Sequence, residues 1–544
     1  MKTFYLLCLA FTLTSLGCFQ LTAKQETTDE QTKQRPNIVF IFSDDHANHA
    51  IGAYQGLFAE VNPTPNIDAL AGRGMLFRNS FCTNSICGPS RAVILTGMHS
   101  HKNGFKANGY RFDGSQVTFP KLLRQAGYQT AMIGKWHLGS NPQGFDYWEV
   151  LPGQGDYYNP VLITEGDKRT QVEGHCTDVV TDKAINWLSD QRDSDKPFVL
   201  MCQHKAPHRA WMPAIRHLDL YADRDMPEPD TMFDTWDDNA SGAQYQTMQI
   251  DDHLHLNYDL HLPLPANFDP DSDTGPSLDK SAFHNLKKLT DEQLSQWNAK
   301  WKDRNEAFEQ ANLTGEDLVR WKFQRYIKNY LRCIKGVDES VGRINDWLKE
   351  NGLAENTIVI YSSDQGFYLG DHGWYDKRWM YDESMMMPLI VSWPGVTEPG
   401  SINEDLVQNL DYAQTFLEIC GAEAPDSMQG RSLVPLLKGE TPEDWRTSLY
   451  YHYHGYPGAH MVPRHYGVRT QDFKLMHFYQ TDEWEFYDLK NDPDEKQNEM
   501  PNDKYTGQVT ALKTELDRLK DFYEEDTDLS VQSKEWIEEM RKRR

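Results

Sequence analysis

Short apolar segments recur along the first 400 residues and predict strands that are buried on both faces. They are rich in β-branched and aromatic residues and cover 36–42, 130–133, 197–202, 357–361 and 387–392. Stretches with helical periodicity lie between them, notably 179–188 and 321–348. This alternation of strand and helix predicts an α/β domain with a mostly parallel sheet flanked by helices.

Two regions depart from that pattern. Residues 221–313 are rich in Asp, Pro and polar residues, which indicates a long insertion with some helix. After Leu437 the apolar runs shorten and are separated by Gly, Asn and Asp, at 449–453, 466–470, 473–478 and 485–489. A helical stretch at about 508–523 follows, so we expect a small C-terminal antiparallel sheet with a helix. The predicted α/β domain covers 36–440, and the α+β subdomain covers 441–544.

The N-terminus has the pattern of an export signal. Met1-Lys2 precedes an apolar run over 4–16 that is too short to span a bilayer, so we expect a signal peptide at 1–18 and a polar tether at 19–35. Gly17-Cys18 also fits the end of a lipoprotein signal, apart from Ser15, which stands where an aliphatic residue is usual. The pattern predicts an exported protein, periplasmic or extracellular, with Cys18 as the candidate lipid anchor on an outer membrane.

Composition narrows the classes of partner. The 544 residues carry a formal net charge of -26, which argues against nucleic acid and anionic membrane surfaces as partners. Hydrophobic residues at 39% are sufficient for a folded core. The six cysteines beyond the leader lack the spacing of a metal site, and some of them are able to pair in an exported protein. They are Cys82, Cys87, Cys176, Cys202, Cys333 and Cys420.

Hard oxygen donors follow two of the predicted strands. Asp44 and Asp45 end the first strand, and Asp364 and Gln365 end the strand at 357–361. In parallel sheets the ligand site lies beyond the carboxyl ends of the strands, so these side chains are expected to meet. Two adjacent buried carboxylates need a counter-charge, and an all-oxygen set favours Ca²⁺ over Zn²⁺. The alternative is an ordinary Asp-Asp pair at the surface.

The segment Cys87-Gly-Pro-Ser-Arg91 places a thiol at the predicted start of a helix. Pro89 suits a first helical turn, and unpaired N–H groups with Arg91 one turn on favour an anion beside the thiol. A cysteine packed beside a helix start is the alternative. Cys87, Pro89, Arg91 and the following Thr96-Gly97 resemble the signature of the sulfatase family. This resemblance implies oxidation of Cys87 to formylglycine by a formylglycine-generating or an anaerobic sulfatase-maturating enzyme.

The resemblance extends to other segments. Gly134-Lys-Trp-His-Leu-Gly139 matches a family motif and implies that Lys135 binds sulfate and that His137 bonds to the formylglycine hydroxyl. In His204-Lys-Ala-Pro-His208, the pair Pro207-His208 implies that His208 binds sulfate and protonates the leaving oxygen, with His204 as a supporting candidate. Lys377 matches the last sulfate-binding lysine, and Arg378 competes for that role. The implied ligands of one Ca²⁺ are Asp44, Asp45, the oxygen derived from Cys87, Asp364 and Gln365.

The family resemblance also implies a fold and a reaction mechanism. It implies an alkaline-phosphatase-like α/β fold and attack of the hydrated aldehyde on sulfur, with Arg91, Lys135 and Lys377 stabilising the sulfate oxygens. Segments 375–384 and 464–470 look like bacterial sulfatases of the N-acetylglucosamine-6-sulfatase type, whose relatives act on glycosaminoglycans and on marine polysaccharides such as ulvan. We therefore expect a sulfated carbohydrate as substrate. Sugar contact and ordinary packing both remain open for Trp374, His460 and His465.

Two other functions fit parts of this pattern. A phosphodiester or phosphonate monoester hydrolase would use the same scaffold, metal and modified cysteine. A non-catalytic binder of sulfated glycans would use the positive pocket but need not retain Cys87. Comparing the turnover of sulfate esters with that of phosphate diesters distinguishes a sulfatase from the first alternative. Release of free sulfate distinguishes it from the non-catalytic binder.

Overall fold

The computed structural model describes residues 35–265, 268–269, 280–456 and 458–527. The predicted signal peptide, the candidate anchor Cys18, most of the tether and the last 17 residues of the C-terminal subdomain lie outside the described residues. The described chain from Pro36 onward belongs to one compact unit. None of the helices in the described part is long and apolar enough to cross a membrane.

The core is a ten-stranded sheet in the order β13-β2-β12-β9-β1-β8-β4-β5-β6-β7. Its five central strands run parallel, in agreement with the predicted mostly parallel sheet, and four of them, all but β5, were predicted as strands. Every residue of β1 and β9 is buried, which explains why both read as continuous apolar runs. The central strands are β9 (Thr357–Ser363), β1 (Asn37–Ser43), β8 (Phe198–Gln203), β4 (Gln129–Lys135) and β5 (Tyr147–Leu151).

The edges of this sheet are mixed in direction. The predicted strand β12 (Leu389–Ser392) runs antiparallel to β9. The remaining strands are short or exposed, so they have no apolar run that would reveal them in the sequence; β7, for example, is exposed at every position. They are β2 (Met75–Phe77), β13 (Ser401–Asn403), β6 (Val161–Thr164) and β7 (Lys168–Gln171).

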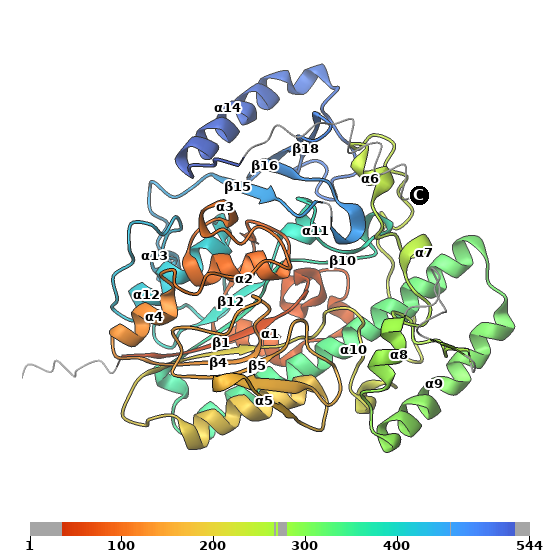
Figure 1. Ribbon diagram of the computed structural model, residues 1–544. Coiled ribbons are helices and arrows are strands. Elements are labelled where there is room, and N and C mark those ends of the chain that lie inside the picture. The colour runs from red at the N-terminus through yellow and green to blue at the C-terminus, as the bar shows by residue number, and fades with distance from the viewer. Residues whose placement is uncertain (1–34, 266–267, 270–279, 457, 528–544) are drawn as a thin grey trace, which may run out of the picture. The chain divides into compact units, whose positions relative to one another are not determined.

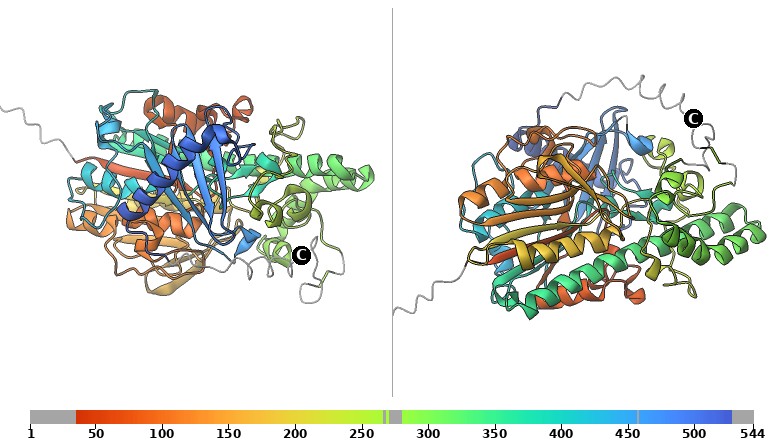
Figure 2. Two further views of the ribbon diagram at one scale, coloured as in Figure 1. Left: turned by 90° about the horizontal axis from the view of Figure 1, so that it is seen from above. Right: turned by 60° about the horizontal axis from the view of Figure 1, so that its bottom comes forward.

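Helices cover both faces of the large sheet, as Figures 1 and 2 show. One face carries α5 and α10, which contact each other, with α1 packed against α10. The opposite face carries α2, α4 and α12, which also contact one another. Their bounds are α1 (Pro65–Arg73), α2 (Cys87–Thr96), α4 (Phe119–Gln125), α5 (Cys176–Asn186), α10 (Gly315–Glu350) and α12 (Tyr412–Ile419).

The predicted insertion contains helices that pack near the N-terminal half of α10. Its longest helix, α9 (Asp291–Ala311), begins at a capping box in which Thr290 and Gln293 bond each other's backbone. Buried Trp301 of α9 stacks under the guanidinium of Arg325 in α10, 3.8 Å from the ring centre. The shorter helices are α6 (Gly242–Tyr245), α7 (Ile250–His253) and α8 (Lys280–Leu286).

The C-terminal region forms the expected antiparallel sheet, in the order β15-β16-β17-β18. Its helix α14 (Thr506–Phe522) packs against β15, β16 and β17. The strands are β15 (Ser448–Tyr453), β16 (His465–Thr470), β17 (Phe473–Phe478) and β18 (Glu483–Asp488). Short elements between the two sheets are α3 (Ser100–Asn103), α11 (Asp382–Met385), α13 (Val434–Leu437), β3 (Ser80–Phe81) and β14 (Val407–Gln408).

Candidate active site

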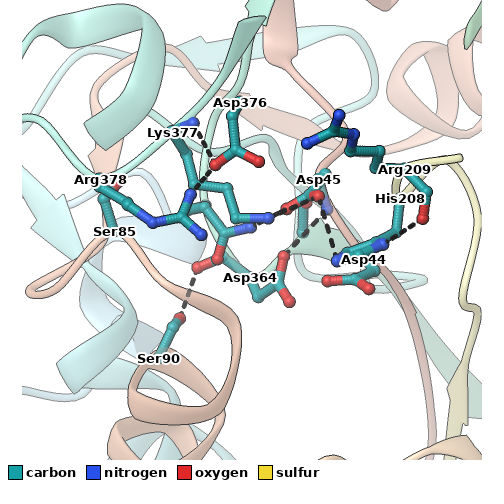
Figure 3. A network of polar contacts seen from close by, with 12 residues as sticks. Asp44, Asp45, Ser85, Ser90, His208, Arg209, Asp364, Asp376, Lys377 and Arg378 are labelled. Carbon is teal, nitrogen blue, oxygen red and sulfur yellow. Dashed lines mark hydrogen bonds and ion pairs between the residues drawn. The ribbon is translucent and has the colours of Figure 1, made fainter. Parts of the chain in front are cut away.

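The candidate residues meet beyond the carboxyl ends of the central strands (Figure 3). Asp44 and Asp45 follow β1, Asp364 follows β9, Lys135 ends β4 and His208 follows β8. Backbone bonds continue the parallel ladder past the strand ends, because the Asp364 N–H donates to the Ser43 carbonyl at 3.3 Å. The strand pairing therefore determines which loops converge.

Three fully buried carboxylates form the centre of the site. Oxygens of Asp44, Asp45 and Asp364 lie within 4.8 Å of one another. The backbone of Asp45 has a left-handed φ of 68°, and its N–H donates to Asp364 Oδ1 at 3.0 Å. Tyr330 of α10 fixes this turn by donating its hydroxyl to the Asp45 carbonyl at 2.6 Å. Burial raises the pKa of Asp45, and Lys377 beside it partly offsets that rise.

The donor set fits a hard dication. Both carboxylate oxygens of Asp44 are buried and receive no hydrogen bond from the described residues, although Lys135 and Arg91 contact them as ion pairs. Gln365 Oε1 is likewise buried without a partner in the described chain, while its Nε2 donates to Asp45. Amide oxygen and nitrogen exchange places by a half turn of the side chain. These oxygens suit Ca²⁺, which takes six to eight such ligands.

Cys87 is the first residue of α2, and its sulfur faces this centre. Ligand atoms of Cys87, Asp44 and His208 lie within 4.8 Å of one another. The thiol is buried, and burial raises its pKa to about 12. The neighbouring Gly88 is required by space, because an added Cβ would lie 2.6 Å from the Phe105 ring. The Gly88 N–H also donates to Asn108 at 3.0 Å, which fixes the start of the helix.

Arg91 holds other site residues in place. Its Nε and Nη2 donate to Asp364 Oδ2 at 3.1 and 2.9 Å. Its Nη1 donates to the Lys135 carbonyl at 2.8 Å and to Gln203 at 2.7 Å. With all three nitrogens engaged by the protein, Arg91 positions Asp364 and the end of β4.

Two buried lysines face the carboxylates; burial lowers the pKa of Lys135, whereas the neighbouring Asp45 raises the pKa of Lys377. Lys135 contacts Asp44, and Lys377 Nζ lies 2.6 Å from Asp45. Lys377 follows the hairpin of β10 (Tyr368–Leu369) and β11 (Tyr375–Asp376). Of the two competing side chains, Lys377 reaches the carboxylates, whereas Arg378 pairs with Asp376 (Figure 3).

Two of the predicted histidines, His208 and His137, lie near the charged residues of the site, and the third, His204, does not. His208 Nδ1 donates to the Arg209 carbonyl at 2.5 Å, which leaves Nε2 toward Asp45, 3.9 Å away. Burial, with Lys135 and Lys377 nearby, lowers its pKa well below the usual value. Burial also lowers the pKa of His137 to about 2, and its Nδ1 has no bonding partner within the described residues. His204 lies away from the centre, with its ring 3.8 Å from Cys202 Sγ.

Two charged residues that the sequence did not single out, Asp376 and Arg209, lie beside the predicted Lys377 and His208. Asp376 pairs with Arg378 and also contacts His460, whose Nε2 lies 3.2 Å from its Oδ2. Arg209 forms a forked pair with Asp259 of the insertion at 2.6 and 2.7 Å. Their neighbours Lys377 and His208 are the signals that could have drawn attention to Asp376 and Arg209.

The open question on three aromatic candidates is resolved by burial. Trp374 is fully buried and stacks on Trp379. His465 is fully buried as well and also stacks on Trp379. Both pack against Trp379, whereas His460 contacts Asp376 of the charged group beside Lys377.

The chain belongs to the sulfatase family. The family model described as Sulfatase matches residues 36–422, and a model described as N-sulphoglucosamine sulphohydrolase, C-terminal, matches residues 370–522. The chain is thus a sulfuric ester hydrolase with an alkaline-phosphatase-like fold.

Individual relatives agree with this family. An N-acetylglucosamine-6-O-sulfatase of Bacteroides thetaiotaomicron is 44% identical over 519 residues, covering 94% of this chain and 91% of the relative. A solved structure of a protein in complex with its substrate D-glucosamine-2-N,6-O-disulfate matches with a TM-score of 0.87 at 44% identity, covering 91% of this chain and 100% of that one. A phosphonate monoester hydrolase from Silicibacter pomeroyi shares the fold, with a TM-score of 0.63 at 19% identity over 89% of this chain and 95% of that one.

Proposed function

We propose that this chain hydrolyses the 6-O-sulfate ester of a glucosamine-type sugar with the help of one Ca²⁺ and a formylglycine at position 87. The observation that carries the proposal is the convergence of Cys87, the three buried carboxylates and the two buried lysines on one centre. The similarity to a glucosamine-6-O-sulfatase supports the choice of sugar.

The residues that would hold Ca²⁺ are Asp44, Asp45, Asp364, Gln365 and the oxygen at position 87. When bound, the ion and the hydrated aldehyde supply a polarised oxygen nucleophile. The protein contributes the alignment: α2 holds residue 87 toward the centre, and Arg91 fixes Asp364 through two bonds. Buried Lys135 and Lys377 are oriented to receive the sulfate oxygens.

The charges of these residues suit an anionic ester. Three carboxylates are matched by Arg91, Lys135 and Lys377, and the pair of Asp376 with Arg378 is neutral in sum. Adding a dication leaves an excess of two positive charges at the centre. A protein with a net charge of -26 thus presents a locally positive pocket to a sulfate group.

His208 is the residue proposed to protonate the departing sugar oxygen. Its side chain is 15% exposed, so it borders the entrance of the site, and a bound anion would raise its lowered pKa toward neutrality. We expect His208→Gln to reduce kcat on a sugar sulfate by about 10²- to 10⁴-fold. The loss should be much smaller with 4-nitrophenyl sulfate, because nitrophenolate leaves without a proton.

The matched control for this variant is His217→Gln, which alters a histidine paired with Glu339 on another part of the molecule. It should leave both rates close to wild type. Equal losses on the two substrates in His208→Gln would show that the histidine is not the acid.

Arg378 is proposed to bind the sugar. Its Nε is buried and has no hydrogen-bond partner in the described part of the chain, whereas its Nη1 pairs with Asp376 Oδ1. We expect Arg378→Gln to raise KM for glucosamine-6-sulfate by about 10- to 100-fold through loss of a charge-assisted bond. KM for 4-nitrophenyl sulfate, which lacks the sugar, should change by less than about threefold, and steady-state kinetics on both esters measure this.

Arg216→Gln is the control, because Arg216 forms an exposed pair with Asp178 and Glu339. A rise in KM of the same size for both esters in Arg378→Gln would mean that Arg378 acts on the sulfate site and not on the sugar.

The substrate is tested by release of free sulfate from defined esters. We expect turnover of 6-O-sulfated glucosamine, N-sulfated or N-acetylated, in preference to its 3-O-sulfated isomer. Turnover of a phosphonate monoester in preference to every sulfate ester would instead support the other hydrolase class. Sugar binding without any sulfate release, by a preparation converted at position 87, would support a binder.

We further propose that the chain is exported, that a maturation enzyme acts on Cys87 and that Cys18 carries a lipid. The apolar run at 4–16 and the pair Gly17-Cys18 support this. Labelling with radioactive palmitate in the native host, compared with Cys18→Ala, tests the anchor. Recovery of unlabelled wild-type protein in the cytoplasmic fraction would contradict it.

A further inference from the structure

A second group of metal-type ligands lies on the small C-terminal sheet. Donor atoms of His452, His454 and Glu525 lie within 4.8 Å of one another. His452 belongs to β15 and His454 directly follows it, so both point to the same side of the strand. Tyr451 points to the other side, where its hydroxyl donates to the Arg378 carbonyl at 2.7 Å. The group is therefore separated from the active site by the strand itself.

Glu525 connects three elements through one carboxylate oxygen. Its Oε2 lies 2.8 Å from His452 Nδ1, 3.2 Å from His101 Nδ1 and 3.0 Å from the Tyr450 hydroxyl. The side chains of Glu525, His452 and His101 are each at most 2% exposed. In Figure 1 the C-terminal end of α14 lies near α3 and β15, which carry these histidines.

His101 is oriented as a metal-binding histidine would be. Its Nε2 faces the Tyr523 carbonyl at 2.8 Å, and because a carbonyl only accepts, Nε2 carries the proton. In the neutral ring Nδ1 then holds a lone pair that faces Glu525 Oε2. Two acceptors 3.2 Å apart repel unless a proton or a cation lies between them. A backbone carbonyl that accepts from the second ring nitrogen is the usual support of a ligating histidine.

His454 supplies an independent observation. Its ring is stacked on His452 with 3.6 Å between centroids, and it is 8% exposed. None of the hydrogen bonds among the described residues uses a nitrogen of this ring, although a ligand atom of it belongs to the cluster. A largely buried imidazole beside a carboxylate and a second imidazole, with neither ring nitrogen hydrogen-bonded among the described residues, has a lone pair available to a metal ion.

We propose that His452, His454 and Glu525 bind one transition-metal dication of the Zn²⁺ type, with His101 as the fourth ligand. Two or three imidazoles and a carboxylate select such an ion over Ca²⁺. Bonds of about 2.0–2.2 Å at tetrahedral angles place neighbouring ligand atoms roughly 3.3 Å apart. Glu525 Oε2 already lies at 2.8 and 3.2 Å from His452 and His101, and a ligand atom of His454 lies within 4.8 Å of those of His452 and Glu525, so binding requires these side chains to close around the ion. The ion would join the segment after α14 to β15 and α3.

Zn²⁺ titration tests the site on the full-length chain. The protein is stripped with a chelator and supplied with excess Ca²⁺ to occupy the active site, and Zn²⁺ binding is followed by calorimetry and by thermal unfolding. We expect one Zn²⁺ per chain, with a rise in Tm. His454→Ala should weaken Zn²⁺ binding by at least about tenfold and abolish the rise in Tm. His477→Ala removes a histidine of β17 that pairs with Asp482, and it should leave the Zn²⁺ affinity and the rise in Tm unchanged.

Two further measurements ensure that the test does not depend on whether His454→Ala folds. Glu525→Gln preserves the shape of the side chain and should also weaken Zn²⁺ binding by about tenfold or more. Co²⁺ bound to the wild-type chain should give the absorption of a tetrahedral nitrogen and oxygen site. Equal Zn²⁺ affinity in wild type, His454→Ala and Glu525→Gln would overturn the proposal. So would the absence of Zn²⁺ binding to the wild-type chain.

Discussion

Replacing Cys87 by Ala should abolish sulfate release, with kcat/KM falling by at least roughly 10⁴-fold. The fold is expected to remain, because the side chain is small and α2 is held by the Gly88–Asn108 bond and by Arg91. An unmodified wild-type chain should be nearly as inactive, because burial keeps its thiol neutral and the leaving sulfate then has no internal route of expulsion. Sulfate release and mass spectrometry of the peptide with residue 87 measure both effects.

The matched control is Cys82→Ala, in the same segment. Cys82 is also buried, but its sulfur contacts Ser85 at 3.4 Å and is not part of the acidic cluster. It should retain activity and conversion of residue 87. Full activity in a preparation whose residue 87 is entirely a thiol would refute the role of formylglycine.

The second large effect is expected from Asp44→Asn, which removes one of three clustered negative charges without changing shape. Ca²⁺ should bind at least about 10²-fold more weakly. Loss of a residue that only hydrogen-bonds to a metal ligand already weakens binding by up to about 10²-fold, and loss of a ligand itself should cost at least as much. Activity at low Ca²⁺ should fall by about 10³-fold, since the nucleophile loses its polarising charge. Both quantities are measured by titrating Ca²⁺ into chelated protein.

Thermal unfolding provides a reading of the same site that does not depend on turnover. At 100 times its Kd, Ca²⁺ should stabilise the wild-type chain by about 2.7 kcal/mol. Asp44→Asn should lose most of that gain. Asp338→Asn is the control, because this buried carboxylate caps α1 through the Asn66 and Ile67 N–H groups, away from the cluster. Unchanged Tm on addition of Ca²⁺ to wild type would contradict the metal assignment.

Four of the five central strands were predictable because they contain continuous apolar runs. The fifth, β5, was not predicted, because its first two residues are only partly buried and Glu149 interrupts the apolar run. All seven residues of β1 and of β9 are buried, and the acidic pairs directly follow both. Because ligand sites in parallel sheets lie beyond the carboxyl ends of the strands, the sequence alone predicts Asp44 and Asp364 at one edge. The helix α9 was harder to detect, because only Trp297, Trp301 and Asn305 of its 21 residues are buried.

The sequence did not reveal which side chains within the site contact one another. Lys377 and Asp45 are 332 positions apart, so no local pattern links them. The spacing from Cys87 to Arg91 correctly puts the arginine one turn along α2, but its guanidinium is committed to Asp364, Lys135 and Gln203. Helix geometry fixes the face on which a side chain lies, whereas the groups that meet it depend on the packing of distant strands.

The central claim is that residue 87 and the oxygens that follow β1 and β9 share a single cation. Diffraction from crystals of the mature, Ca²⁺-loaded enzyme tests it most directly. We predict one ion about 2.3–2.6 Å from oxygens of Asp44, Asp45, Asp364 and Gln365 and from the oxygen at position 87. An active crystal with an intact thiol at position 87, or with the cation bound elsewhere, would contradict the account.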